Sequence, residues 1–149
     1  MERITSHSVL ETEDIASAWL SHISELGKNS KKAYRVGLSG HLGAGKTTFV
    51  KAIAKTMGCA EHVTSPTFVI MKKYDTTHLI FNQLVHIDAY RLQSAEELHK
   101  LHFKDVCEQT STLILMEWPE HVGLQQDDFD SFIEFEITNS GYEMRFTRV

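Results

Sequence analysis

Apolar and polar residues alternate along the chain with helical periods in some segments and extended periods in others, which is typical of an α/β protein. Apolar residues recur at helical spacing between Thr12 and Gly27, so we expect Thr12 to cap a first helix and Gly27 to end it. A second helix is predicted from Lys46 to Met57. Helical patterning returns over residues 94–108.

Extended segments are predicted between and after these helices. A short edge strand is predicted over residues 3–6, and a buried strand over residues 34–39. Further strands are predicted over residues 68–74, 79–87, 113–116, 133–137 and 142–148. Residues 113–116 form a continuous apolar run, the pattern of a strand covered on both faces. No repeat or linker interrupts the pattern, so we expect one domain over residues 1–149, built on a mixed, partly parallel sheet flanked by helices.

Composition excludes several classes of protein. The chain has 149 residues, of which 42% are hydrophobic and 23% charged, as in ordinary globular domains. Its 15 basic and 20 acidic residues do not provide the strongly basic face of an autonomous nucleic-acid binder. No apolar run approaches the ~20 residues that span a bilayer, and no secretory signal is visible. The two cysteines, Cys59 and Cys107, fit neither a disulfide framework nor a metal site, so we expect a cytoplasmic protein without a membrane partner.

One loop carries the clearest chemical signal. Gly40-x-x-x-x-Gly45-Lys46-Thr47 matches the P-loop pattern GxxxxGK[ST], between a predicted strand and a predicted helix. Glycines let backbone N–H groups approach phosphate oxygens, and the following helix adds its positive N-terminal end. Lys46 supplies a charge for the β- and γ-phosphates, and the Thr47 hydroxyl is an oxygen ligand suited to Mg²⁺. The loop therefore predicts phosphate binding.

Two carboxylates follow apolar strands, in the position of a Walker B acid. Asp88 ends the run from Leu84 to Ile87, and Glu117 ends the run over residues 113–116. Both are candidates to lie at Mg²⁺ and to orient the water that attacks a phosphoryl group. Residues 64–68 form a second polar loop, which either senses the γ-phosphate or is a plain turn. None of the nine histidines shows a metal-ligand spacing, and we assign no metal to them.

Four segments follow one another along the chain: GHLGAGKTTF, TSPTF, HIDAYRL and LMEWPE. Together, over residues 8–122, they resemble the bacterial TsaE family, the ATPase of tRNA threonylcarbamoyladenosine biosynthesis. The resemblance implies a P-loop NTPase-like, three-layer fold that binds ATP and Mg²⁺ and hydrolyses ATP. It also implies two partners, a threonylcarbamoyl-transferase and its inactive paralogue, which together modify adenosine 37 of tRNAs reading ANN codons. The tRNA is then expected to be held by the partners.

The resemblance also implies which residues form the site. The nucleotide-binding residues implied are Leu42, Gly43, Ala44, Gly45, Lys46, Thr47, Thr48, Thr67, Trp118 and Glu120. The metal-binding residues implied are Thr47, Asp88 and Glu117, and the catalytic residues implied are Lys46, Asp88 and Glu117. The chain departs from the family pattern at His41, where the family usually has Asp.

The sequence is also compatible with two other functions. A small-molecule kinase also uses a P-loop, but it usually carries an arginine-bearing lid, and the chain has no arginine-rich insertion. A nucleotide-gated binding module would use ATP as a conformational switch, with hydrolysis incidental. Measured ATP turnover separates the second alternative from an ATPase.

Overall fold

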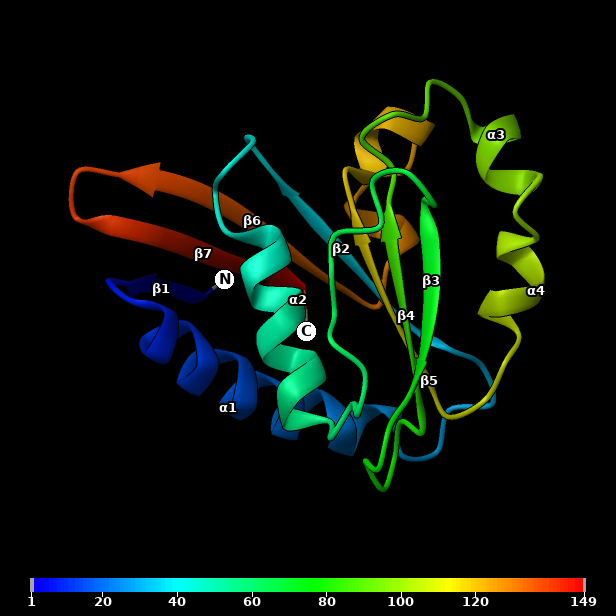
Figure 1. The fold of residues 1–149 in the computed structure, drawn as a ribbon, viewed down its shortest axis with the longest axis horizontal. Coiled ribbons are helices and arrows are strands. Elements are labelled where there is room, and N and C mark those ends of the chain that lie inside the picture. The colour runs from blue at the N-terminus through cyan, green and yellow to red at the C-terminus, as the bar shows by residue number, and fades with distance from the viewer. Residues whose placement is uncertain (1, 149) are drawn as a thin grey trace.

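The computed structural model describes residues 2–148, which form one seven-stranded sheet with helices packed on it (Figure 1). The strands are β1 (Glu2–Ser6), β2 (Tyr34–Gly40), β3 (Met71–Asp75), β4 (Gln83–Asp88), β5 (Thr112–Glu117), β6 (Ser131–Thr138) and β7 (Gly141–Arg148). The helices are α1 (Val9–Gly27), α2 (Lys46–Thr56), α3 (Ala95–His99) and α4 (Phe103–Cys107), with two short 3-10 helices, η1 (Pro119–Val122) and η2 (Gln126–Asp128).

The sheet is mixed, as the sequence predicted. Its strand order is β1-β7-β6-β2-β5-β4-β3. The four central strands, β6, β2, β5 and β4, run parallel to one another, and the pairs β1–β7, β6–β7 and β3–β4 are antiparallel. Strand β2, which leads into the glycine loop, therefore lies between two parallel neighbours.

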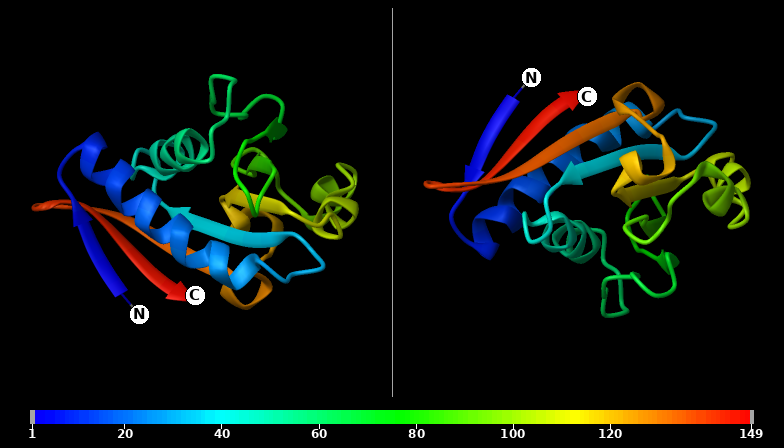
Figure 2. Two further views of the ribbon diagram at one scale, coloured as in Figure 1. Left: turned by 90° about the horizontal axis from the view of Figure 1, so that it is seen from below. Right: turned by 90° about the horizontal axis from the view of Figure 1, so that it is seen from above.

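Two apolar cores on opposite faces of the sheet make the fold a three-layer one. The first core joins α1 and α2 to the sheet through side chains such as Trp19, Phe49 and Leu115. The second joins α3, α4 and η1 to the other face, where Ile87, Ile114 and Met116 are buried. Each fully buried large apolar side chain contributes about 1.5–3 kcal/mol. In Figure 2, α3 and α4 lie at the β3–β4 end of the sheet, away from β1 and β7.

The first helix begins earlier than the sequence predicted. Its N-cap is Ser8, whose Oγ accepts a hydrogen bond from the Glu11 backbone N–H at 3.1 Å. Thr12, the predicted cap, is buried one turn inside the helix, and its hydroxyl contacts Ser6 Oγ at 2.8 Å. The helix does end at Gly27, as predicted.

Three other predicted boundaries were wrong. Residues 68–70 form a turn, and strand β3 begins at Met71 because Ile70 has a left-handed backbone (φ 72°) that interrupts extended pairing. Strand β4 begins at Gln83, four residues later than predicted. The helical pattern over residues 94–108 divides into α3 and α4, since His102 is also left-handed (φ 58°).

None of the helices within residues 2–148 combines the length and the apolar character that a bilayer span requires.

Candidate functional site

The candidate site lies at the carboxyl ends of the parallel strands β2, β5 and β4, the edge where open α/β sheets bind ligands. The glycine loop (residues 40–46) follows β2, while Glu117 and Asp88 end β5 and β4 and are register partners. A cavity of about 280 Å³ opens there, which we call the phosphate cavity. It is lined by Leu42, Gly43, Gly45, Lys46, Thr47, Thr48, Ser65, Thr67, Asp88, Tyr90 and Glu117.

The path of the glycine loop requires glycine at two positions. Gly40 has a φ of 138°, and a Cβ there would lie 2.3 Å from the Phe135 carbonyl oxygen on β6. Gly45 has a φ of 104° and is the N-cap of α2, where a side chain would be strained. With these glycines the loop turns tightly over the start of α2, whose first backbone N–H groups lack partners within the helix.

Lys46 is almost fully buried, with 4% of its surface exposed, and its ammonium lies inside the glycine loop. Nζ donates to the carbonyl oxygens of Gly40 and His41, the latter at 2.9 Å. Nζ also lies 4.1 Å from the centroid of the Trp118 ring. Burial lowers the pKa of Lys46, and the nearby carboxylates, Glu117 foremost, act in the opposite direction. The charged form of Lys46 is thus unfavourable in this buried position unless anionic groups lie close to it.

Thr47 and Glu117 contact each other directly. The Thr47 hydroxyl donates to both carboxylate oxygens of Glu117, at 2.9 and 3.1 Å. Because this hydrogen bond uses the hydroxyl proton, the lone pairs of Thr47 Oγ1 remain available to a metal ion. Glu117 is buried, and its Oε1 also lies 2.8 Å from Nε2 of His86.

His86 is a site residue that the sequence did not single out. It lies two residues before Asp88 on β4, so the two side chains share one face of the sheet. Its spacing of two residues from a candidate metal ligand was the sequence signal that could have identified it. The residue that His86 contacts, Glu117, is 31 residues away along the chain, so no local pattern connects the two.

Asp88 connects the sheet to the second polar loop. Its Oδ2 accepts from the hydroxyls of Thr67 at 2.9 Å and Ser65 at 3.2 Å, and its Oδ1 accepts from the Tyr90 N–H at 3.0 Å. Two residues of the loop, Ser65 and Thr67, therefore line the phosphate cavity and contact a predicted metal ligand.

Aromatic side chains form one wall of the site. The rings of Tyr90, Trp118 and His121 contact one another, with centroids 5.1 to 5.7 Å apart. Trp118 covers Lys46 from a left-handed backbone position (φ 59°). Glu120 lies farther out, where its Oε1 accepts from Ser39 Oγ at 3.3 Å. Trp118 and Glu120 thus flank the phosphate cavity without lining it.

A second cavity of about 240 Å³ lies on the other side of the glycine loop, and we call it the apolar cavity. It is lined by Ser8, Val9, Thr12, Gly43, Ala44, Gly45, Thr48, Phe135, Tyr142 and Met144. Ala44, one of the predicted nucleotide-binding residues, faces this cavity, and Thr48 lines both cavities. No local sequence pattern indicated this cavity, since α1, β6 and β7 contribute to it from distant segments.

The oxygen donors of the site fit Mg²⁺. Thr47, Asp88 and Glu117 line one cavity and offer a hydroxyl and two carboxylates. Within residues 2–148 there is no cluster of three or more His, Cys, Asp or Glu side chains placed to hold a metal by themselves. Mg²⁺ typically takes one or two carboxylates and completes its octahedron with waters and substrate phosphates, so a partial protein shell suits it.

Comparisons with known proteins agree on a single family. The family model described as threonylcarbamoyl adenosine biosynthesis protein TsaE matches residues 7–147. The tRNA threonylcarbamoyladenosine biosynthesis protein TsaE of Rickettsia bellii is 34% identical over 126 residues, 80% of this chain and 78% of that protein. The protein of that name from Borreliella burgdorferi is 34% identical over 105 residues, 70% and 74% of the two chains.

A solved structure has the same fold. The crystal structure of Bacillus subtilis YdiB superimposes with a TM-score of 0.64 at 24% sequence identity, over 99% of this chain and 85% of that one. This likeness supports the P-loop NTPase-like α/β fold. The match of the family model to nearly the whole chain, together with these relatives, shows that the chain belongs to the TsaE family of tRNA threonylcarbamoyladenosine biosynthesis proteins.

Proposed function

We propose that residues 1–149 act as a single Mg²⁺-dependent ATPase domain, required for N6-threonylcarbamoylation of adenosine 37 in tRNAs that read ANN codons. It would act in the cytoplasm with a threonylcarbamoyl-transferase and its inactive paralogue. The observation that carries the proposal is the arrangement of Lys46, Thr47 and Glu117 around one cavity at the end of β2 and β5. Such an arrangement of a buried cation, a hydroxyl and a carboxylate suits a nucleoside triphosphate with its Mg²⁺.

The two cavities together suit a whole nucleotide. The triphosphate would occupy the phosphate cavity, with its oxygens against the loop backbone and Lys46. Thr48 lines both cavities, so the nucleotide would pass this residue as it leaves the loop. The base would then lie in the apolar cavity, between Val9, Phe135 and Met144.

Hydrolysis requires the protein mainly to position the reactants and neutralise charge. Lys46 and the loop N–H groups would stabilise the charge on the transferred phosphoryl group, to which Mg²⁺ adds its own positive charge. Glu117 would orient the attacking water, because its carboxylate faces the cavity beside Thr47. Asp88 would hold the Ser65–Thr67 loop against the site. Glu117 and Asp88 would exchange roles if only Asp88 proved necessary for turnover.

Apolar side chains around the phosphate cavity support a partner-docking role for this edge. Leu42, Phe68, Val69 and Tyr90 are all exposed, and Phe68 has 84% of its surface accessible. The guanidinium of Arg91 stacks on the Phe68 ring at 4.4 Å from its centroid. A protein partner that covers the nucleotide would bury this surface.

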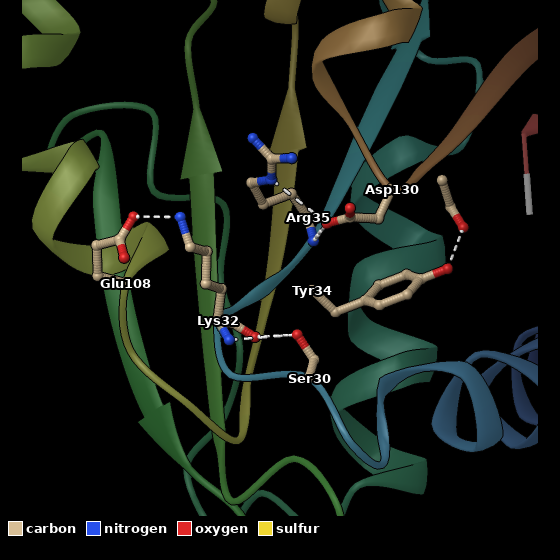
Figure 3. A network of polar contacts seen from close by, with 7 residues as sticks. Ser30, Lys32, Tyr34, Arg35, Glu108 and Asp130 are labelled. Atoms are coloured by element: carbon tan, nitrogen blue, oxygen red, sulfur yellow. Dashed lines mark hydrogen bonds and ion pairs between the residues drawn. The ribbon is translucent and has the colours of Figure 1, made fainter.

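Two of the basic residues at positions 28–35 are paired with acids, and this pairing supports an indirect contact with tRNA, through the partners. Figure 3 shows Lys32 paired with Glu108 at 3.1 Å and Arg35 paired with Asp130 at 3.3 Å. An RNA backbone would have to compete with these acids for the two cations. We therefore assign tRNA binding to the partners.

The deciding experiment measures ATP hydrolysis by the chain alone, and then with both partners and tRNA. We expect slow turnover alone and faster turnover in the full mixture, with formation of threonylcarbamoyladenosine. Nucleotide binding without turnover in any mixture would favour the nucleotide-gated module. Phosphorylation of a small molecule would favour the kinase.

A further inference from the structure

His86 is a fully buried polar side chain on the central part of the sheet. On β4, Leu84, His86 and Asp88 face α2, while Val85 and Ile87 face the opposite core. The register partner of His86 on β5 is Leu115, and both residues are fully buried. The register partner on the other side is Lys72 on β3, and the imidazole lies one level beneath the phosphate cavity.

The hydrogen bonds of His86 are incomplete. Nε2 lies 2.8 Å from Glu117 Oε1, whereas Nδ1 is buried and has no hydrogen-bond partner among the described residues. A carboxylate oxygen accepts hydrogen bonds, so we infer that Nε2 donates its N–H to Glu117, while the buried Nδ1 has no partner within residues 2–148. A buried polar atom without a hydrogen-bond partner destabilises the folded state. A leucine would fill this layer without an unpaired ring nitrogen, but it would remove the contact that His86 makes with the buried Glu117 carboxylate.

We propose that His86 is a positioning residue, whose Nε2–H holds the Glu117 carboxylate in the orientation that Mg²⁺ and the attacking water require. This inference rests on the proposed ATPase function. Glutamate has three side-chain torsions, and a carboxylate at the end of a strand needs contacts from other elements to stay in place. Thr47 on α2 provides one such contact, and His86 on β4 provides the other.

The two contacts differ in what a ligand does to them. Thr47 is itself a proposed metal ligand, so its bond to Glu117 adjusts when Mg²⁺ and ATP bind. His86 lies beneath the cavity and does not line it, so its bond is independent of the ligand. His86 therefore keeps the Glu117 carboxylate in one orientation during turnover.

Two amide variants separate the hydrogen bond from the packing. The side-chain nitrogen of glutamine reaches about as far from the backbone as histidine Nε2, whereas that of asparagine reaches about as far as Nδ1. His86→Gln keeps a donor next to Glu117, and His86→Asn does not. His86→Leu removes both ring nitrogens and keeps the layer filled.

We expect His86→Asn and His86→Leu to raise the Mg²⁺ concentration for half-maximal hydrolysis, or to lower kcat, by roughly 10- to 100-fold, the usual effect of losing a contact behind a metal ligand. His86→Gln should restore most of this loss. The affinity for ADP without Mg²⁺, measured by calorimetry, should stay within about twofold of the wild-type value in all three variants, since the loop and Lys46 are unchanged. The Mg²⁺ dependence of ADP binding should instead change in the same variants as the Mg²⁺ dependence of hydrolysis.

A ¹⁵N spectrum of the imidazoles provides a readout that does not depend on ATP. The nucleotide-free protein should show His86 as the Nε2–H tautomer. Finding the Nδ1–H tautomer, or equal Mg²⁺ dependence in His86→Gln and His86→Asn, would overturn the proposal. If His86→Leu fails to fold, the comparison of His86→Gln with His86→Asn still tests the proposal. A wild-type protein that binds no Mg²⁺·ADP would contradict the ATPase function, while the tautomer would still test the contact with Glu117.

Discussion

Lys46 and Glu117 are the charged side chains that approach each other across the phosphate cavity, and both are nearly inaccessible to solvent. Each is held by short contacts to its surroundings, Lys46 to loop carbonyls and Glu117 to Thr47 and His86. Buried charges held in this way are costly to the fold and useful to a reaction, because a dry site strengthens their effect on a substrate. Substitutions at these two positions should therefore affect function more than stability.

Replacing Lys46 with alanine should abolish productive nucleotide binding. The variant loses the cation proposed to contact the phosphates, and truncating one partner of a buried charge pair costs about 2–5 kcal/mol, or roughly 30-fold or more in affinity. Titration calorimetry with ATP measures the effect, and thermal unfolding should show a retained fold. Lys51→Ala is the matched control, since Lys51 lies exposed on the same helix. Unchanged affinity in Lys46→Ala would contradict the phosphate assignment.

Replacing Glu117 with glutamine should slow hydrolysis by roughly 100- to 10,000-fold, the range for loss of a general base, while ATP binding changes much less. Glutamine keeps the size of the side chain and removes its charge. Single-turnover hydrolysis and calorimetry measure the two effects separately. Asp88→Asn is the comparison, because normal turnover in Glu117→Gln with slow turnover in Asp88→Asn would exchange the roles of the two acids.

At the scale of elements, the sequence predicted those features that depend on neighbouring residues. The glycine loop and the strands ending at Asp88 and Glu117 were predicted because glycine spacing and apolar runs are local signals. The predicted start of β3 was wrong, since the apolar residues Phe68 and Val69 lie exposed in a turn that precedes the strand. His86 and the apolar cavity were missed because their contacts join segments that only the folded sheet brings together.

The loop over residues 64–70 should depend on its hydrogen bonds to Asp88. Thr67→Val removes one hydroxyl at nearly constant shape, and a hydrogen bond to a charged group contributes about 1.5–3 kcal/mol. Amide hydrogen exchange in this loop should accelerate about tenfold or more, because local opening becomes easier. Thr110→Val is the control, as it changes an exposed threonine just before β5, at the opposite end of the strand. Equal exchange in the two variants would show that the Thr67 hydroxyl does not hold the loop.

At the scale of the whole molecule, the overall charge does not favour direct binding to RNA. The formal net charge is −5 at pH 7 with histidines neutral. The basic residues that approach one another most closely in sequence, around positions 28–35, include two that are paired with acids (Figure 3). We therefore expect residues 2–148 to attract the tRNA backbone only weakly.

The isolated chain should bind tRNA weakly and without specificity. Fluorescence anisotropy with labelled tRNA at near-physiological salt tests this, with the two partner proteins as a positive control. Submicromolar affinity of the chain alone would place tRNA on this protein. In that event, Lys32→Glu and Arg35→Glu would show whether residues 28–35 form the contact.

The pairing of β1 with β7 has a consequence for how the protein is made. The ribosome releases β1, α1 and the glycine loop long before it releases residues 141–148. Until then, β1 has no neighbour on the β7 side, and the apolar cavity lacks the wall formed by Tyr142 and Met144. A nascent chain thus presents its glycine loop early, and the apolar cavity is completed only after β7 has emerged. Because the proposed nucleotide site includes this cavity, we expect stable nucleotide binding only in chains whose synthesis has passed β7.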